Sequence, residues 1–444
     1  MMAFKRKKRV LPEVPVRVRI ESLTHDGRGI ARVDGKPVFI DGALPGEDVS
    51  FVYTDSRRDY AEGKVESLHA AAPGRVAPRC PSFGVCGGCS FQHAADDTQI
   101  ELKQSLLVEQ FRRVAKLEEI PLFPPLTGPS WGYRHKARLG VKYVAKKGRV
   151  LVGFRERSSP FIAELEVCPV LHPKVGKHLS ELSELIGGLS LRDRLPQIEV
   201  AVGDDRAALV FRILEDLTDE DTRRLKDFGA RFDFNIYVQR QGPDSVRALF
   251  PEHPELLRYE LPEQGVEFRF QPTDFTQVNI EINRKMVSRV MELLDPQPGE
   301  RILDLFCGIG NFTLPLATRA GQVVGVEGSR AAVERAAWNA QEQGLGNVEC
   351  HMADLTAPLA GQAWADAHYD KILLDPSRAG AEEVLAGVPR WAARRIVYVS
   401  CNPSTLARDA GILVHEHGYR LVRAGVMDMF PQTAHVESIA LFEK

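Results

Sequence analysis

The sequence predicts an α/β protein whose C-terminal part, residues 271–444, is a doubly wound parallel sheet. Two observations support this prediction. From residue 301 onward, short apolar strands alternate with stretches of helical periodicity. These strands run into an acid, a glycine turn or a cysteine, and open α/β sheets bind ligands at the carboxyl ends of their strands. We therefore expect a ligand site at that edge of the sheet.

Composition excludes several classes of protein. The chain has 444 residues, is 44% hydrophobic and 27% charged, and carries a formal net charge of −2. These values are typical of a globular protein of two to four domains without a global field that attracts nucleic acid. No long apolar run follows the N-terminus, so we expect no signal peptide and no membrane contact. The sequence thus predicts a cytoplasmic protein with reduced cysteines, and no obligate protein partner is evident.

Residues 1–12 form a predicted basic arm, and residues 13–72 a small all-β domain. The arm contains the run Lys5–Arg9, which is equally compatible with RNA binding and with a solubilising tail. In the next segment Val14, Val16 and Val18 alternate with other residues, as in a half-buried strand. Five short strands separated by glycine turns predict a barrel of the OB type, which commonly binds single-stranded nucleic acid. A barrel that only packs against its neighbour is the alternative.

Three cysteines lie within ten residues, at Cys80, Cys86 and Cys89. This spacing predicts one metal centre, for which Cys168 is the best candidate for a fourth ligand and His93 a substitute. Zinc and an iron–sulfur cluster both accept four thiolates. The spacing therefore indicates a metal site but does not identify the metal.

Residues 73–270 form a predicted central α+β domain. It begins with a long helix over Ala94–Leu117, and a strand is expected over Tyr133–Val144. Three basic side chains are expected to line one face of that strand: Arg134, Lys136 and Arg138. Phosphate contacts and an ordinary solvated sheet face are equally compatible with this pattern.

The strands of residues 271–444 end in residues suited to a nucleoside ligand. A strand at residues 301–305 runs into the glycine turn Cys307-Gly-Ile-Gly310. The next strand ends in Glu327, which suits the two hydroxyls of a ribose, and the third leads to Asp354, which could accept from an adenine amino group. The fourth runs into Asp375. This order favours S-adenosylmethionine-dependent methyltransferases over nicotinamide dehydrogenases.

The fifth strand, residues 396–399, is followed by Ser400-Cys401-Asn402-Pro403. Proline fixes φ and has no N–H, so the strand must break there. Taken alone, Cys401 is more often a small buried hydrophobe than a functional thiol. Its place at the carboxyl end of a strand makes it a candidate nucleophile.

Five segments together resemble the RNA uracil 5-methyltransferase (m5U) family. They are Phe275-Thr-Gln-Val-Asn279, Asp304-Leu-Phe-Cys-Gly-Ile-Gly-Asn-Phe312, Asp375-Pro-Ser-Arg378, Ser400-Cys-Asn-Pro403 and His435-Val-Glu-Ser438. In front of them, Gly27-x-Gly29-x-Ala31 and Leu44-Pro-Gly-Glu47 resemble the TRAM domain, an RNA-binding barrel. Barrel and cysteines are similar to the iron–sulfur members that methylate a defined uridine of 23S ribosomal RNA. The tRNA-modifying relatives are expected to lack both.

The resemblance implies roles for individual residues. Contacts with S-adenosylmethionine would come from Gln277, Phe306, Asn311, Glu327, Asp354 and Asp375. A 4Fe-4S cluster would be held by Cys80, Cys86, Cys89 and Cys168. Cys401 would be the nucleophile and Glu437 the base, with His435 the competing choice.

The implied chemistry is methylation of uracil carbon 5 through a covalent cysteine–uracil adduct. A thiolate added to carbon 6 makes carbon 5 nucleophilic, and a base then removes its proton. The target base, in a single strand or loop, must leave any stack to reach the thiol. Two alternatives stay open: the same chemistry on tRNA or another rRNA uridine, and a non-catalytic iron–sulfur RNA-binding factor.

Overall fold

The computed structural model describes residues 11–12, 14–357, 359 and 361–444, and the chain divides into two compact units. One unit comprises residues 1–102 and 431–435, and the other residues 103–430 and 436–444. The predicted basic run Lys5–Arg9 lies outside the described residues. In the described part of the chain, no helix has the length and apolar character needed to cross a membrane.

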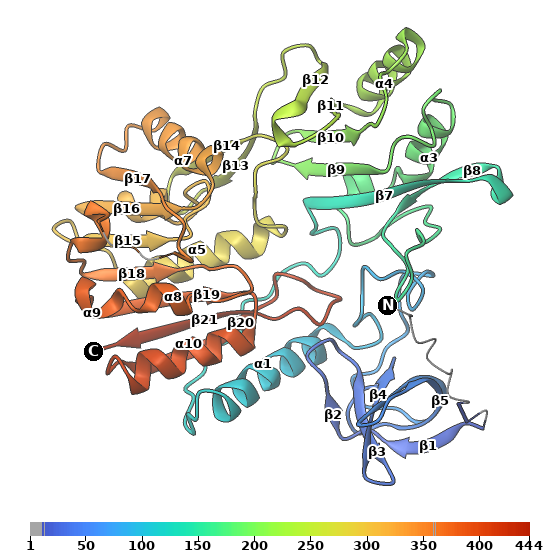
Figure 1. The fold of residues 1–444 in the computed structure, drawn as a ribbon, viewed down its shortest axis with the longest axis horizontal. Helices are drawn as coiled ribbons and strands as arrows, with labels where there is room; N and C mark the ends of the chain where they lie inside the picture. Colours follow the sequence, from blue (N-terminus) through green and yellow to red (C-terminus); the bar gives the residue numbers. More distant parts are fainter. Residues whose placement is uncertain (1–10, 13, 358, 360) are drawn as a thin grey trace, which may run out of the picture. The chain divides into compact units, whose positions relative to one another are not determined.

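The first unit contains a six-stranded sheet in the order β1-β5-β6-β4-β3-β2 (Figure 1). Its strands are β1 (Val16–Arg19), β2 (Ser22–Leu23), β3 (Gly29–Val33), β4 (Lys36–Asp41), β5 (Asp48–Ser56) and β6 (Ala61–Ala70). β1 pairs with β5, and only two residues later β2 pairs with β3. One short segment therefore joins both edges of the sheet and closes it into a barrel.

The barrel is built as its sequence pattern predicts, with one strand more than expected. Its interior is filled by small and branched apolar side chains, among them Ile20, Val38, Ile40, Val49 and Phe51. The additional strand arises because the first apolar run is divided into β1 and β2. At Ile20 the backbone turns to bond with Glu47, which accounts for the division.

The cysteine loop and helix α1 (Asp96–Arg113) follow the barrel. The helix is shorter than the predicted Ala94–Leu117, and the boundary between the two units falls within it, after Leu102. It begins with Asp96 and Asp97 and ends with Arg112 and Arg113, which complements the helix dipole at both ends.

The second unit begins with a mixed six-stranded sheet in the order β12-β11-β10-β9-β7-β8. Its strands are β7 (Lys136–Val144), β8 (Arg149–Gly153), β9 (Gln197–Val202), β10 (Ala207–Arg212), β11 (Phe234–Gln239) and β12 (Val246–Phe250). The helices of this part are α2 (Pro173–Gly176), α3 (Leu179–Gly187) and α4 (Asp219–Phe232), with short 3-10 turns η1 (Ala145–Lys147) and η2 (Pro243–Ser245).

The two faces of this sheet have different neighbours. One face packs on α3 and α4 through a core that includes Leu139 and Leu209 of the sheet (Figure 1). On the other face, Ala208, Val210 and Tyr237 belong to the core that extends to the C-terminal sheet. The middle strands are thus covered on both faces.

The basic face predicted for β7 is only partly present. Lys136 is largely buried and its Nζ donates to the carbonyl of Pro272 at 2.5 Å. Burial lowers the pKa of Lys136 to about 8. Arg134 is half-buried, whereas Arg138 is exposed beside Glu199. The prediction failed at Lys136 because alternation identifies a face but not what covers it.

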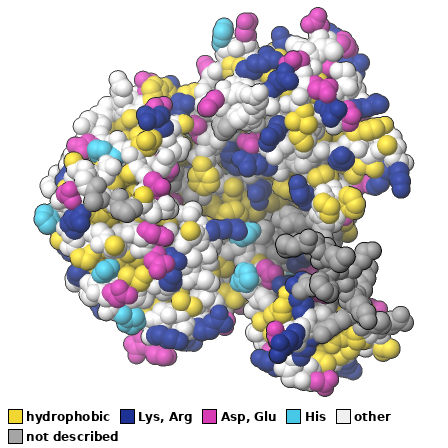
Figure 2. All heavy atoms as spheres, in the orientation of Figure 1, with side chains coloured by type: hydrophobic (Ala, Val, Ile, Leu, Met, Phe, Trp, Pro, Cys, Tyr) yellow, Lys and Arg dark blue, Asp and Glu magenta, His cyan; other side chains and the backbone are white. Residues whose placement is uncertain are grey.

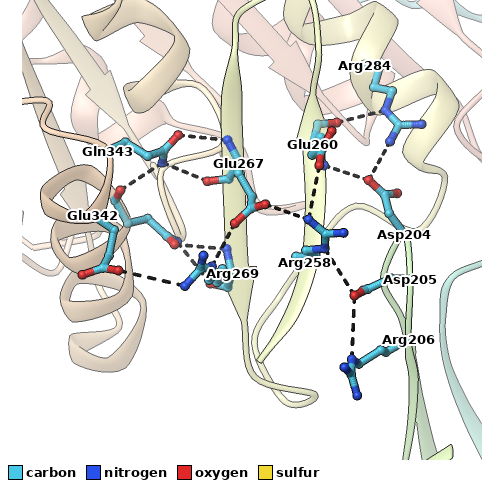
Figure 3. A network of polar contacts seen from close by, with 11 residues as sticks. Asp204, Asp205, Arg206, Arg258, Glu260, Glu267, Arg269, Arg284, Glu342 and Gln343 are labelled. Carbon is cyan, nitrogen blue, oxygen red and sulfur yellow. Dashed lines mark hydrogen bonds and ion pairs between the residues drawn. The ribbon is translucent and has the colours of Figure 1, made fainter. Parts of the chain in front are cut away.

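A hairpin of β13 (Leu257–Leu261) and β14 (Val266–Phe270) connects the middle sheet to the C-terminal sheet. Figure 3 shows the polar network that fixes it. Arg258 contacts Asp205 and Glu267, and Glu267 exchanges backbone hydrogen bonds with the side chain of Gln343. Each exposed ion pair contributes little, but together they hold the hairpin, and Tyr259 with it, in one position.

The C-terminal sheet has seven strands in the order β17-β16-β15-β18-β19-β21-β20. They are β15 (Arg301–Leu305), β16 (Gln322–Glu327), β17 (Val348–Met352), β18 (Lys371–Leu374), β19 (Arg395–Ser400), β20 (Arg420–Met427) and β21 (Glu437–Glu443). The helices are α5 (Ile280–Leu294), α6 (Thr313–Ala317), α7 (Arg330–Glu342), α8 (Glu382–Leu385), α9 (Val388–Trp391) and α10 (Pro403–His415), with the 3-10 turn η3 (Ala363–Asp366).

Six of these strands run in the same direction, and β21 runs antiparallel to its neighbours β19 and β20. Order and direction confirm the predicted doubly wound sheet. The chain reverses its strand order between β15 and β18, and ligands bind at such a switch point. Because β21 is antiparallel, its start lies at the same edge as the carboxyl ends of β15 to β19.

Candidate active site

Cys401 is held in a rigid turn between a strand and a helix. β19 ends at Ser400, whose Oγ donates to the carbonyl of Asn402 at 3.0 Å and accepts from the Asn402 N–H at 3.1 Å. The Asn402 side chain caps α10 by accepting from the Ser404 N–H. Cys401 between them is half-buried. The thiol thus has a fixed position at the edge of the sheet.

Glu437 starts β21 next to this turn. Ser400 pairs with Ser438, so the end of β19 lies beside the first residues of β21. The Glu437 side chain is buried, whereas His435 is exposed. Burial, and after it the neighbouring Glu437, raise the pKa of Cys401 to about 11. The structure therefore brings together the predicted nucleophile and the predicted base.

Three buried carboxyl groups belong to this part of the sheet. Burial raises the pKa of Asp304 to about 7 and that of Asp375, which also faces Asp304, to about 8. Burial and Asp375 also raise the pKa of Glu437 well above its usual value, against the opposing charge of Arg378. At neutral pH the site accordingly holds protons that a bound cation would displace.

The glycine turn after β15 has an unusual backbone. Phe306 has a φ of 66°, which is rare for a residue with a side chain, and Gly308 and Gly310 are also left-handed. The N–H groups of Phe306 and Cys307 both bond to the carbonyl of Val326, at 2.9 and 3.1 Å. Strain of this kind persists where the surroundings enforce it, often at ligand sites.

Glu327 and Asp354 follow the next two strands. Glu327 accepts from the N–H of Gly308 at 3.2 Å and from that of Ser329 at 2.9 Å. Asp354 is exposed, and both the N–H and the hydroxyl of Thr356 donate to it, which lowers its pKa. The N–H of Ala353 bonds to the Glu327 carbonyl and so connects the two loops.

Asn311 is fixed by two residues that the sequence did not single out. Its Oδ1 accepts from the Tyr259 hydroxyl and from Asn283 Nδ2, each at 2.9 Å, and its Nδ2 donates to Asn283 Oδ1 at 2.9 Å. One Asn311 N–H remains for a ligand. Gln277 is half-buried and lines a small pocket with Tyr259 and Asn283. Asn283 lies one helical turn after Asn279, the last residue of the family segment Phe275–Asn279. This spacing is the only feature of the sequence that could have indicated Asn283.

The cysteine loop, residues 80–89, belongs to the first unit. The N–H of Cys86 bonds to the Ser82 carbonyl at 2.9 Å, and the Gly88 N–H points to Cys86 Sγ at 3.4 Å. Cys168 belongs to the second unit and is half-buried. Among the residues that the structure describes, no three His, Cys, Asp or Glu side chains are grouped as metal ligands. The predicted cluster site is therefore not seen preformed.

Comparisons with known proteins match the chain over its whole length. The family model "tRNA (Uracil-5-)-methyltransferase" matches residues 182–444, and a TRAM domain model matches residues 15–65. A protein of Methylococcus capsulatus named 23S rRNA (uracil(1939)-C(5))-methyltransferase RlmD is 61% identical over 443 residues, with 100% of both chains covered. A protein of the same name from Alkalilimnicola ehrlichii is 56% identical over 440 residues, with 99% of each covered.

One solved structure is similar to nearly the whole chain. It is the Pyrococcus abyssi tRNA (uracil-54, C5)-methyltransferase in complex with S-adenosyl-L-homocysteine, with a TM-score of 0.73 and 26% identity over 96% of this chain and 100% of that one. Coverage of 96% must include most of the barrel. The expectation that tRNA-modifying relatives lack the barrel is therefore wrong, and the barrel does not distinguish the two kinds of substrate.

Proposed function

The chain belongs to the tRNA (uracil-5-)-methyltransferase family, and we propose that it transfers a methyl group from S-adenosylmethionine to carbon 5 of a uridine in 23S ribosomal RNA. The geometry that carries the reaction is the Cys401 thiol beside the buried Glu437 carboxyl. The substrate is supported by relatives of 61% and 56% identity over nearly the full length. We expect the enzyme to act in the cytoplasm, where ribosomal RNA is made.

The covalent route follows from the chemistry of these two side chains. The Cys401 thiolate adds to carbon 6, and the electron pair of the double bond makes carbon 5 nucleophilic. Carbon 5 would take the methyl group of S-adenosylmethionine, and the electron pair of the broken sulfur–methyl bond would stay on the sulfur of S-adenosylhomocysteine. The Glu437 carboxylate then takes the proton from carbon 5, and the returning electron pair expels the thiolate. The site starts and ends with the same two groups, and one proton is released.

The cofactor contacts are assigned by the chemistry at each strand end. Glu327 and Asp354 accept hydrogen bonds, as ribose hydroxyls and an adenine amino group require. Phe306 and Asn311 belong to the glycine turn, where one Asn311 N–H is available, and Gln277 and Asp375 are the two remaining proposed contacts. The carboxyl groups of Asp304, Asp375 and Glu437 give the site an affinity for a positively charged sulfonium.

The four cysteines are proposed to hold a 4Fe-4S cluster with a structural role. Support comes from the spacing of Cys80, Cys86 and Cys89 and from the N–H that points to Cys86 Sγ, a feature common around thiolate ligands. No step of the reaction requires electron transfer. Analysis of iron and sulfide after anaerobic purification tests this assignment, and zinc without sulfide would contradict it.

The barrel at residues 13–72 is proposed to bind the RNA around a uridine that has left its stack. Residues 73–270 are proposed as the cluster domain and residues 271–444 as the methyltransferase domain. Mass spectrometry of RNA from a strain lacking the protein tests the substrate. We expect one 5-methyluridine to disappear from 23S ribosomal RNA. Its disappearance from tRNA alone would move the same chemistry to tRNA.

A further inference from the structure

A groove of about 880 Å³ lies on the middle sheet, away from the residues assigned to the reaction. Its floor is the face of β7 opposite the helices, with Gly140 at its centre, and Leu151 of β8 beside it. Its wall is the hairpin from Phe154 to Ala163, closed by the bonds Glu156 N–H to Phe161 carbonyl and Ala163 N–H to Phe154 carbonyl, each at 2.9 Å. Figure 2 shows basic and hydrophobic side chains next to each other over this end of the sheet.

The charge of the groove is positive. Four basic side chains line it, Arg138, Lys142, Lys147 and Arg155, against one acid, Glu156. Arg138 is paired with Glu199 and Lys147 with Glu164. Among the described residues, Lys142 and Arg155 have no acidic partner within ion-pair distance. Two cations are thus available to an anionic ligand.

An exposed aromatic ring accompanies these cations. Phe161 is 69% exposed, although large apolar side chains are normally buried. It lies in the wall of the groove, with Phe154 and Pro160 among its neighbours in the lining. Cations that track a backbone, combined with aromatic rings on which bases stack, are typical of sites for single-stranded nucleic acid.

The strand that forms the floor of the groove is attached at its start to a segment of the candidate active site. The N–H of His135 bonds to the Val278 carbonyl at 2.8 Å, and Lys136 Nζ bonds to the Pro272 carbonyl, so the segment carrying Gln277 is attached to the start of β7. From Lys136 to Lys142 the strand extends roughly 20 Å on the same face. Beyond Lys136, which the segment around Pro272 covers, this face carries Arg138, Gly140 and Lys142, all of which line the groove.

We propose that this groove is a second contact site for the RNA substrate, in which a base next to the target region stacks on Phe161 while Lys142 and Arg155 bind phosphates. The inference rests on the proposed function, because it assumes that the target uridine of the RNA is bound at Cys401. The face of β7 opposite the helices would then contribute to the affinity for RNA and would take no part in the chemical step.

Binding of a 23S ribosomal RNA fragment that the wild-type enzyme methylates tests the proposal. We expect Phe161→Ala to weaken RNA binding roughly tenfold. The double variant Lys142→Ala/Arg155→Ala should reduce the slope of log affinity against log salt by about 0.7 for each lost phosphate contact. Affinity for S-adenosylmethionine and kcat at saturating RNA should stay near the wild-type values, which also shows that the variants are folded.

Lys226→Ala is the matched control, since Lys226 is exposed on α4, which covers the opposite face of the sheet. It should leave RNA affinity and salt slope unchanged. If both groove variants bind RNA with the affinity and salt slope of the wild-type enzyme, while the wild-type enzyme methylates the fragment, the inference about the groove is wrong and the proposed function stands. Failure of the wild-type enzyme to methylate any 23S fragment would overturn the proposed function as well.

Discussion

The ligand edge of the C-terminal sheet holds two groups of acids in opposite surroundings. Asp304, Asp375 and Glu437 are buried, and burial raises the pKa of each. Asp354 is exposed, and hydrogen bonds from Thr356 lower its pKa. Of the buried group, Asp375 and Glu437 act on Cys401, whereas the exposed acid follows β17, which forms one edge of the sheet. Acidic side chains at one ligand edge thus have raised pKa values where they are buried and a lowered pKa where they are exposed and hydrogen-bonded.

Among the acids at this edge, replacing the proposed base Glu437 should cause the largest loss of activity. Glu437→Gln keeps the shape of the side chain but cannot accept the carbon 5 proton, so we expect kcat to fall by roughly 10²–10⁴-fold. Addition and methyl transfer should persist, and a covalent RNA–protein species should accumulate on denaturing gels. His435→Gln is the control and should retain most activity. Equal losses in both variants, with no accumulated species, would place the base elsewhere.

Asp375→Asn separates stability from function in the buried group. A carboxyl whose pKa is about 8 in the folded protein stabilises the fold fully below the pKa of the unfolded chain, near 4, and this contribution is lost as the pH rises toward 8. The amide stays neutral, so the variant should be more stable than wild type at pH 8, on the order of 5 kcal/mol, and similar at pH 4. Urea unfolding from pH 4 to 8.5 measures this. The affinity of the variant for S-adenosylmethionine should decrease. If the free energy of unfolding depends on pH in the same way in the variant and the wild type, Asp375 is ionised in the folded protein.

Tyr259→Phe tests the positioning of Asn311. The variant removes the hydroxyl that donates to Asn311 Oδ1 at 2.9 Å and leaves the ring in place. We expect affinity for S-adenosylmethionine, measured by calorimetry, to fall about fivefold, the effect of one lost hydrogen bond. Tyr237→Phe, another buried tyrosine, should not change it. If Asn311→Ala also left the affinity unchanged, Asn311 itself would not be a cofactor contact.

Asp354→Asn should have the smallest effect. The side chain is exposed and the amide oxygen can still accept from Thr356, so the free energy of unfolding should match wild type from pH 5 to 8. Affinity for S-adenosylmethionine should fall only a few-fold, since one exposed charge-assisted hydrogen bond is weakened. A stability change as large as that of Asp375→Asn would remove the contrast between the two groups of acids.

Periodicity and turn chemistry were sufficient to predict the C-terminal sheet. The strand expected over residues 396–399 is β19 (Arg395–Ser400), and the strand expected at residues 301–305 is β15 (Arg301–Leu305). Between β18 and β19 the helical segment is divided into two short helices, α8 and α9. Gly387 lies between them, close to the Trp391 ring, where a side chain would clash. A requirement of this kind comes from packing and leaves no periodic signal.

The sequence predicted the site where residues are placed by strand ends. Cys401 was a candidate because of its strand end, whereas Glu437 came from the family resemblance, and the structure adds that their strands are neighbours. The Asn283–Asn311 pair could not be predicted, because 28 residues separate its members and only the packing of α5 against the glycine turn brings them together. The burial of Lys136 by the segment around Pro272 has the same origin. Contacts between elements distant in sequence are therefore what the structure adds.

Covalent trapping on RNA that contains 5-fluorouridine tests the central claim most directly. Fluorine cannot be removed as a proton, so an enzyme that uses the Cys401 route should form a stable complex with the RNA in the presence of S-adenosylmethionine. We expect a denaturation-resistant adduct with wild type and none with Cys401→Ala, whose affinity for S-adenosylmethionine should be retained. An adduct that persists in Cys401→Ala, or methylation of ordinary RNA by that variant, would contradict the assignment of Cys401 as the nucleophile.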